Sequence, residues 1–306
     1  MRVLSIQSHV VHGYVGNKAA VFPLQLLGFD VDVVNSVQFS NHTGYLKKWE
    51  GDVLNGSELD KLLVGLERND LLKNTQHLLT GYIGSESFLR SVLRVLKTLK
   101  KHNTNMRYIC DPVLGDNDKL YVPAELVDIY KKDVIPLSNI VTPNQFEVEQ
   151  LTGITVNTME DAIRATDALH QVGPEIVVIT SMLLKGKEDK ISILASQRLS
   201  FEDGSSEDHL WCIETPVLDG SYTGTGDITA ALLLAWSAKD PGNLGIVLEK
   251  TVSTMYKIIE TTMTQRDGTV AGKELKLIQC KEIIENPPTI FKANKLTQGL
   301  KGVDHC

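Results

Sequence analysis

The chain has 306 residues, of which 42% are hydrophobic and 23% charged, and its 31 Lys and Arg against 38 Asp and Glu give a net charge of −7. This composition is typical of a soluble globular protein and excludes a disordered one. The acidic balance, with no dense Lys/Arg stripe, argues against nucleic acid and anionic membrane surfaces as partners. No stretch approaches the roughly 18 consecutive apolar residues of a membrane span.

Short β-type runs alternate with helical patterns through the first third of the chain. Strands are predicted at residues 3–6, 31–34, 77–79 and 106–110, and helices between them start after Asn17, at Ser57 and at Ser85. Both serines precede an acidic residue and suit helix N-caps, while Gly28 suits the end of the first helix. Such β-α repetition is typical of a parallel sheet.

The pattern changes after a helix from Thr158 to about Gly173 and a strand at 176–180. Three β-type runs follow, at 191–195, 198–201 and 209–213, and predict an antiparallel addition to the sheet edge. Helices from Asp227 and over about 244–264 close the fold. Since no linker divides the chain, residues 1–306 are predicted to form one α/β domain, with 287–306 as a weakly structured tail.

Ligands of open α/β sheets bind at the carboxyl ends of the strands, so the loops there are the first place to look for a site. The loops after the first two strands are polar and rich in small residues. Ser8 and Thr43 are candidates to hydrogen-bond a polar substrate, with Val15 and Phe39 as apolar walls. Ordinary turn chemistry explains each of these residues equally well.

A sharper signal follows the strand that ends near residue 110. Asp111 and Asp116 flank a Pro and a Gly in the segment Asp-Pro-Val-Leu-Gly-Asp. Because carboxylate oxygens are hard ligands, Asp116 is a candidate for holding Mg²⁺, directly or through water, and Asp111 for a monovalent ion. A capped turn is the alternative.

Two later strand ends carry further polar side chains. Thr142, Asn144 and Glu147 form a cluster suited to phosphates and a hydrated metal, and Asn144 with Glu147 also reads as a helix N-cap with its acid; both interpretations can hold at once. Thr180 and Ser181 add two hydroxyls, for which a simple cap is the alternative.

Gly224-Thr225-Gly226-Asp227 immediately precedes a long apolar run. Two glycines and a following helix N-terminus present bare N–H groups that suit phosphate oxygens. Asp227 is then either a base that accepts a proton from an attacking hydroxyl or an ordinary first-turn helix acid. The sequence has neither a Walker A motif nor a strand-linked Gly-x-Gly-x-x-Gly, which excludes the two common phosphate-loop families.

Together with the segments at 111–116 and 142–144, the Gly-Thr-Gly-Asp motif resembles the ribokinase superfamily. Within that superfamily, residues 4–10, 13–17 and 35–44 closely resemble the animal-type pyridoxal kinases, and the resemblance runs from Arg2 to roughly Lys281. It implies a three-layer α-β-α sandwich with a mostly parallel central sheet and an antiparallel edge. It also implies ATP-dependent phosphorylation of the 5′-hydroxymethyl group of pyridoxal, pyridoxine or pyridoxamine, with Mg²⁺ or Zn²⁺, with K⁺, and by a cytoplasmic homodimer.

The resemblance also implies a role for each matching residue. Asp227 corresponds to the catalytic base, and the amides of Gly224, Thr225 and Gly226 to the anion hole. The implied sets are, for the pyridine ring, Ser8, Val15, Phe39, Thr43, Tyr82 and Tyr121; for the divalent metal and phosphates, Asp116, Asn144 and Glu147; for the monovalent ion, Asp111 and Thr142; and for the nucleotide, Thr180, Ser181, Thr225, Gly226 and Val252.

Two segments depart from the mammalian pattern: residues 117–120 are short for a lid over ATP and substrate, and residues 219–223 differ before the anion hole. Two alternative functions stay open. A hydroxymethylpyrimidine kinase of the same superfamily would use the same Asp227 on another ring. A non-catalytic pyridoxal 5′-phosphate-binding protein would have no need of a base aimed at a phosphoryl acceptor.

Overall fold

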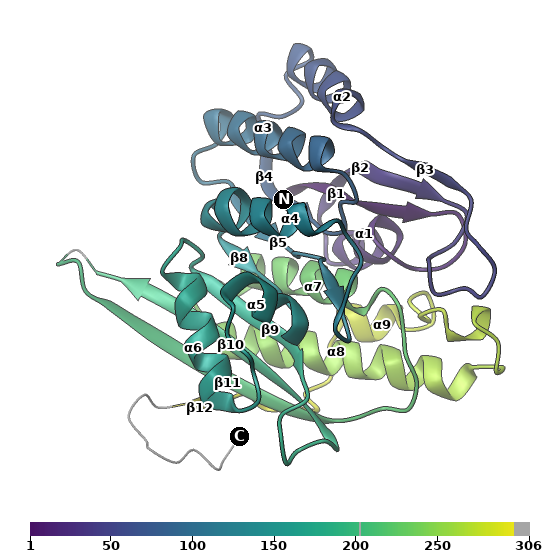
Figure 1. Ribbon diagram of the computed structural model, residues 1–306, viewed down its shortest axis with the longest axis vertical. Coiled ribbons are helices and arrows are strands. Elements are labelled where there is room, and N and C mark those ends of the chain that lie inside the picture. The colour runs from purple at the N-terminus through teal and green to yellow at the C-terminus, as the bar shows by residue number, and fades with distance from the viewer. Residues whose placement is uncertain (202, 297–306) are drawn as a thin grey trace.

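The structure, a computed structural model, describes residues 1–201 and 203–296 (Figure 1). A ten-stranded sheet in the order β12-β11-β10-β9-β8-β5-β4-β1-β2-β3 runs through this part of the chain. Its strands are β1 (Arg2–Val10), β2 (Asp30–Phe39), β3 (Gly51–Val53), β4 (Thr75–Thr80), β5 (Arg107–Cys110), β8 (Ile140–Val141), β9 (Ile176–Met182), β10 (Lys190–Ser200), β11 (Ser206–Pro216) and β12 (Asn294–Leu296). A separate two-stranded sheet pairs β6 (Gly115–Asp116) with β7 (Lys119–Leu120).

The centre of the main sheet, from β2 to β9, is parallel. Antiparallel strands extend it at both edges, β3 beside β2 and the series β10, β11 and β12 beside β9. The predicted parallel sheet and antiparallel edge are confirmed. Parallel strands point the same way, so the loops that follow β1, β2, β4, β5, β8 and β9 all open at one end of the sheet.

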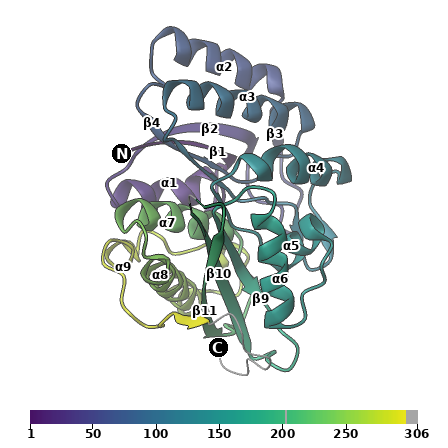
Figure 2. The same ribbon diagram turned by 90° about the vertical axis from the view of Figure 1, so that its left-hand side faces the viewer.

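Helices cover both faces of the sheet and produce three layers, as Figure 2 shows. The helices are α1 (Asn17–Leu26), α2 (Gly56–Arg68), α3 (Glu86–His102), α4 (Ala124–Ile129), α5 (Gln145–Thr152), α6 (Met159–His170), α7 (Thr225–Lys239), α8 (Leu244–Gln265) and α9 (Lys281–Glu285). One apolar core joins the sheet to α2 through α6, and another joins the opposite face to α1, α7, α8 and α9. Parallel strands buried on both faces explain the continuous apolar runs in the sequence.

Several predicted helix starts are confirmed and one is wrong. Ser85 and Thr158 cap α3 and α6 with their side-chain hydroxyls. The cap of α2 is Asn55 rather than Ser57, because the Asn55 side chain accepts from the Ser57 N–H while Glu58 reaches back to the Asn55 N–H. This reciprocal capping box stabilises an earlier start of the helix.

The strands are longer than predicted. β1 and β2 pair in parallel as far as Val10 and Phe39, so Ser8 and Phe39 lie in strands and not in the loops assigned to them. The runs predicted at 191–195 and 198–201 are one strand, since β10 pairs with β11 without a break from Lys190 to Ser200. Partner strands supply hydrogen bonds to polar residues that interrupt the local pattern.

Candidate active site

The N-terminus of α7 lies at the carboxyl ends of the parallel strands, the location that the sequence predicts for a ligand site. Gly224 caps the helix with φ 91°, a conformation that favours glycine, and a Cβ there would lie 2.1 Å from the Tyr14 carbonyl oxygen. Thus the loop after β1 packs directly on the start of α7. The first N–H groups of the helix, including those of Thr225 and Gly226, have no acceptor within the helix and are available to an anion.

Asp227 sits in the first turn of α7, and its Oδ2 accepts a hydrogen bond of 2.7 Å from the Gly16 N–H. Gly16 in turn packs against Ser8, because a Cβ on Gly16 would lie 2.3 Å from Ser8 Oγ. Burial raises the pKa of Asp227 to about 6, against the opposing effect of the Gly16 N–H. A carboxylate with this pKa is ionised near neutral pH and is a better proton acceptor than an ordinary Asp.

Three acidic side chains gather near this point from distant parts of the sequence. Asp111, which follows β5, is buried, and its pKa is raised by desolvation and then by the negative charges of Glu147 and Asp227. A Cβ on Gly226 would lie 3.4 Å from Asp111 Oδ2, which places the predicted anion hole beside this carboxylate. Mutually repelling carboxylates in a desolvated setting suit the binding of a cation.

Glu147 is buried in the first turn of α5. Its Oε1 accepts from the N–H groups of Leu114 and Gly115, and its Oε2 accepts from the N–H of Asn144. The Asn144 side chain caps the same helix, so the capping interpretation of this pair is confirmed. Burial raises the pKa of Glu147 to about 8 despite these bonds.

Thr142 and Asn144 link the strand ends of the site. Thr142 Oγ1 donates to Asp111 Oδ1 at 3.2 Å, and Asn144 Nδ2 donates to the Gly115 carbonyl at 2.8 Å. The loop after β8 is therefore tied both to Asp111 and to the β6–β7 hairpin. These bonds give the predicted polar cluster a fixed position.

Asp116 and Tyr121 lie on and just after that hairpin. The short segment at 117–120 forms a tight turn in which Asn117 and Asp118 have φ 45° and 60°, between the paired Asp116 and Lys119. Asp116 is partly exposed. The pKa of Tyr121 is raised by the burial of its own hydroxyl and by a hydrogen bond between that hydroxyl and Asp116. The negative charge of Asp116 also contributes to the raised pKa of Glu147.

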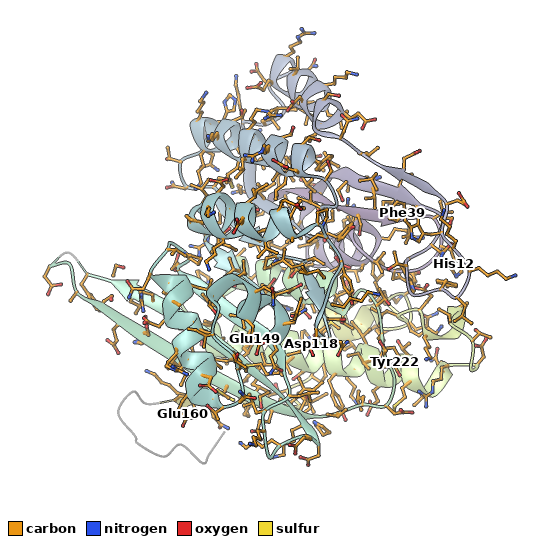
Figure 3. All side chains as sticks on the ribbon, in the orientation of Figure 1. His12, Phe39, Asp118, Glu149, Glu160 and Tyr222 are labelled. Atoms are coloured by element: carbon orange, nitrogen blue, oxygen red, sulfur yellow. The ribbon has the colours of Figure 1, made fainter. Side chains whose placement is uncertain are left out.

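The predicted apolar walls come together in a small cluster outside the two main cores. Val15 and Phe39 are buried there with Val10 and Val37, and Tyr82 and Trp49 pack against them. Phe39 stacks on Trp49 with ring centroids 3.9 Å apart. Figure 3 shows Phe39 on the same side of the molecule as His12, which belongs to the loop after β1. The cluster joins β1, which carries Ser8, to the loop after β1, whose Gly16 N–H binds Asp227.

The remaining candidates lie around this centre in different settings. Thr43 is exposed in the loop between β2 and β3. Thr180 and Ser181 are partly exposed near the end of β9, where the Thr180 N–H and Oγ1 both donate to the Pro143 carbonyl. Val252 is buried in the core on α8.

Sequence reasoning missed three contributors. The Gly16 N–H on Asp227 joins residues 211 positions apart, which no local pattern reveals. Trp49 had a signal, an aromatic residue in a polar loop. Glu274 had none: it is buried, and its carboxylate accepts from the Tyr14 N–H, 260 positions away.

Within residues 1–201 and 203–296, no group of three or more His, Cys, Asp or Glu side chains is arranged to hold a metal ion. A divalent ion here would share its ligands with phosphate oxygens, as Mg²⁺ usually does. Over the same residues, no helix is both long enough and apolar enough to cross a membrane.

Comparisons with known proteins identify relatives over nearly the whole chain. Residues 73–267 match the family model described as phosphomethylpyrimidine kinase. The chain is 50% identical to the pyridoxal kinase of Arabidopsis thaliana, covering 96% of this chain and 94% of the relative, and 45% identical to that of Homo sapiens, covering 96% and 98%. The structure of pyridoxal kinase from Leishmania donovani with ADP and pyridoxamine superposes with a TM-score of 0.89 at 34% identity, covering 97% of this chain and 99% of that one.

The three-layer fold and a helix N-terminus with its carboxylate define a small-molecule kinase with a ribokinase-like fold. Within this class, sequence identities of 50% and 45% over 96% of the chain show that it belongs to the pyridoxal kinase family. The family resemblance inferred from the motifs is confirmed. The protein is accordingly a transferase that uses ATP to phosphorylate B6 vitamers.

Proposed function

We propose that Asp227 is the general base that accepts the proton of the 5′-hydroxyl of pyridoxal, pyridoxine or pyridoxamine as that oxygen attacks the γ-phosphorus of ATP. The observation that carries the proposal is the Asp227 carboxylate held by Gly16 at the first turn of α7. The N–H groups at Gly224, Thr225 and Gly226 bind the transferred phosphoryl group. Phosphoryl transfer depends chiefly on in-line positioning and charge stabilisation, which this arrangement supplies.

The apolar cluster formed by Val15, Phe39 and Tyr82 lies against the pyridine ring in this proposal. Its composition supports the role, since a flat heteroaromatic ring packs well on aromatic and branched side chains. The polar edges of the ring contact Ser8 and Thr43, and Tyr121 borders the ring from the hairpin.

The acidic cluster holds the cations that phosphoryl transfer needs. Asp116 and Glu147 bind Mg²⁺ or Zn²⁺, and Asp111 with Thr142 binds K⁺. The raised pKa values of Asp111 and Glu147 support this assignment, because burial and, to a lesser degree, neighbouring carboxylates disfavour their negative charges, and a bound cation would offset both effects. A divalent ion bound here neutralises charge on the ATP phosphates.

Asn144, Thr180, Ser181 and Val252 border the nucleotide in the same proposal. The solved relative contains ADP, which supports a nucleotide site in this fold. We further propose that residues 1–306 form one kinase domain, that it is a homodimer, and that it acts in the cytoplasm. Light scattering after size-exclusion chromatography tests the dimer.

Steady-state kinetics of Asp227→Ala with ATP, Mg²⁺ and pyridoxal test the central role. We expect kcat to fall by roughly 10²-fold or more, while the Kd of pyridoxal changes by less than about tenfold, because a general base acts in the transition state. Asp128→Asn, an exposed acid paired with Lys132 on another surface, is the control and should keep full activity. Near-normal turnover of Asp227→Ala would refute the base. Replacing K⁺ by Na⁺ in the same assay tests the monovalent site.

The match of residues 73–267 to the phosphomethylpyrimidine kinase model favours one second candidate, a kinase for hydroxymethylpyrimidine. Its ring would stack on the same apolar cluster and present its hydroxymethyl group to Asp227. Side-by-side values of kcat/KM for the pyrimidine and for pyridoxal distinguish the two. A higher value for the pyrimidine would displace pyridoxal as the preferred substrate.

A further inference from the structure

A buried carboxylate lies between the two loops that flank the proposed vitamer site. Glu274 follows the short 3₁₀ turn η3 (Ala271–Lys273), and only 8% of it is exposed. In Figure 1 the yellow-green segment after α8 approaches the purple loops that follow β1 and β2. The side chain thus connects three parts of the chain that are remote in sequence.

Glu274 accepts hydrogen bonds from both loops. Oε2 accepts from the Tyr14 N–H at 2.9 Å, in the loop after β1. Oε1 accepts from the Tyr45 hydroxyl at 2.9 Å and lies 3.2 Å from His42 Nε2, both in the loop after β2. His42 Nδ1 accepts from the Gly44 N–H, so the ring proton is on Nε2 and is donated to Glu274. The three groups that bond to this carboxylate therefore all act as donors.

The packing around the carboxylate leaves little freedom. Gly13 has φ 98°, and a Cβ there would lie 2.3 Å from Glu274 Oε1. The rings of His42 and Tyr45 pack with centroids 4.8 Å apart. Burial alone would raise the pKa of Glu274, but the bonds from His42, Tyr14 and Tyr45 outweigh burial and lower it. The group is an ionised acceptor at neutral pH.

We propose that Glu274 is a positioning residue that fixes the separation of the two vitamer-binding loops. Through Tyr14 it holds the loop that carries Val15 and Gly16, and through His42 and Tyr45 it holds the loop that carries Thr43. The inference rests on the proposed function of those loops. Glu274 bonds to the two vitamer loops and reaches the anion hole only indirectly, where the Tyr14 carbonyl packs on Gly224, so its loss should weaken vitamer binding more than ATP binding.

Glutamine cannot replace this carboxylate. Its amide nitrogen must face either the Tyr14 N–H or the His42 and Tyr45 donors, and a buried donor then loses its acceptor. We therefore expect Glu274→Gln to raise the KM of pyridoxal about tenfold, with the KM of ATP within about twofold of the wild-type value. Tyr45→Phe removes one donor and should raise the KM of pyridoxal by about two- to fivefold.

The matched control is Glu175→Gln, at the opposite end of the sheet. Glu175 also ties distant segments, through Arg107 and Gln197, and should leave both KM values unchanged. If Glu274→Gln does not fold, Tyr45→Phe decides the question. An unchanged KM of pyridoxal, or equal rises in the KM values of pyridoxal and ATP, overturns the positioning role. An active Asp227→Ala would instead overturn the proposed site, so the two failures are distinguishable.

Discussion

Replacing Asp227 by Asn should stabilise the ligand-free protein while it abolishes activity. The folded protein raises the pKa of this carboxyl from 3.8 to about 6 because burial disfavours its charge. At about 1.4 kcal/mol for each pKa unit, this difference corresponds to about 3 kcal/mol that ionised Asp227 costs the folded state. An Asn carries no charge, and its side-chain oxygen can still accept from the Gly16 N–H.

The sign of the pH dependence follows from the same values. Since the folded state binds this proton more tightly than the unfolded state, protonation of Asp227 stabilises the fold, and that contribution is lost as the pH rises from about 4 to about 6. The stability difference between Asp227→Asn and wild type should therefore be at most about 3 kcal/mol at pH 8. It should shrink toward zero below pH 4.

Urea unfolding of both proteins at pH 8 and pH 4.5, without ATP, Mg²⁺ or K⁺, measures this difference. In a thermal melt at pH 8 the expected increase in Tm is about 5 °C. Asp128→Asn, whose side chain is 70% exposed, should change the unfolding free energy little. An inactive Asp227→Asn that is no more stable than wild type at pH 8 would show that burial does not penalise this carboxylate.

Three further outcomes follow from the same contacts. The kcat/KM of pyridoxal should fall as the pH is lowered through about 6, because the base must be ionised, and a flat profile from pH 5 to 7 would contradict this assignment. Gly16→Ala should lower the unfolding free energy by more than about 2 kcal/mol in urea titrations. Gly16 has φ 54°, and the added Cβ would lie 2.0 Å from the Ser8 carbonyl oxygen. Unchanged stability would mean that the loop adapts to the methyl group. Thr158→Ala should cost about 1 kcal/mol by removing the cap of α6 and leave kcat unchanged, so a loss of activity at normal stability would point to an unsuspected role.

Much of the fold was predictable because its signals are local. A helix cap depends only on residues a few positions away, and the structure confirms the predicted caps at Ser85 and Thr158. The alternating apolar runs that predict strands and helices are local in the same sense. Two wrong predictions have different causes, one a competing local cap and one a partner strand that decides the length of the element. Asn55 displaces Ser57 as a cap through its bond geometry, and β10 stays unbroken because β11 pairs along its whole length.

The candidate site divides in the same way. The residue types of the Gly-Thr-Gly-Asp motif and of the acids after β5 and β8 indicated phosphate and cation chemistry. The predicted parallel sheet indicated that these segments lie at one end of the strands. Only the tertiary structure revealed that Gly16 holds Asp227, that Trp49 stacks on Phe39, and that Glu274 joins the two vitamer loops. These contacts join segments distant in sequence, and local periodicity carries no information about which distant donor a buried carboxylate will accept from.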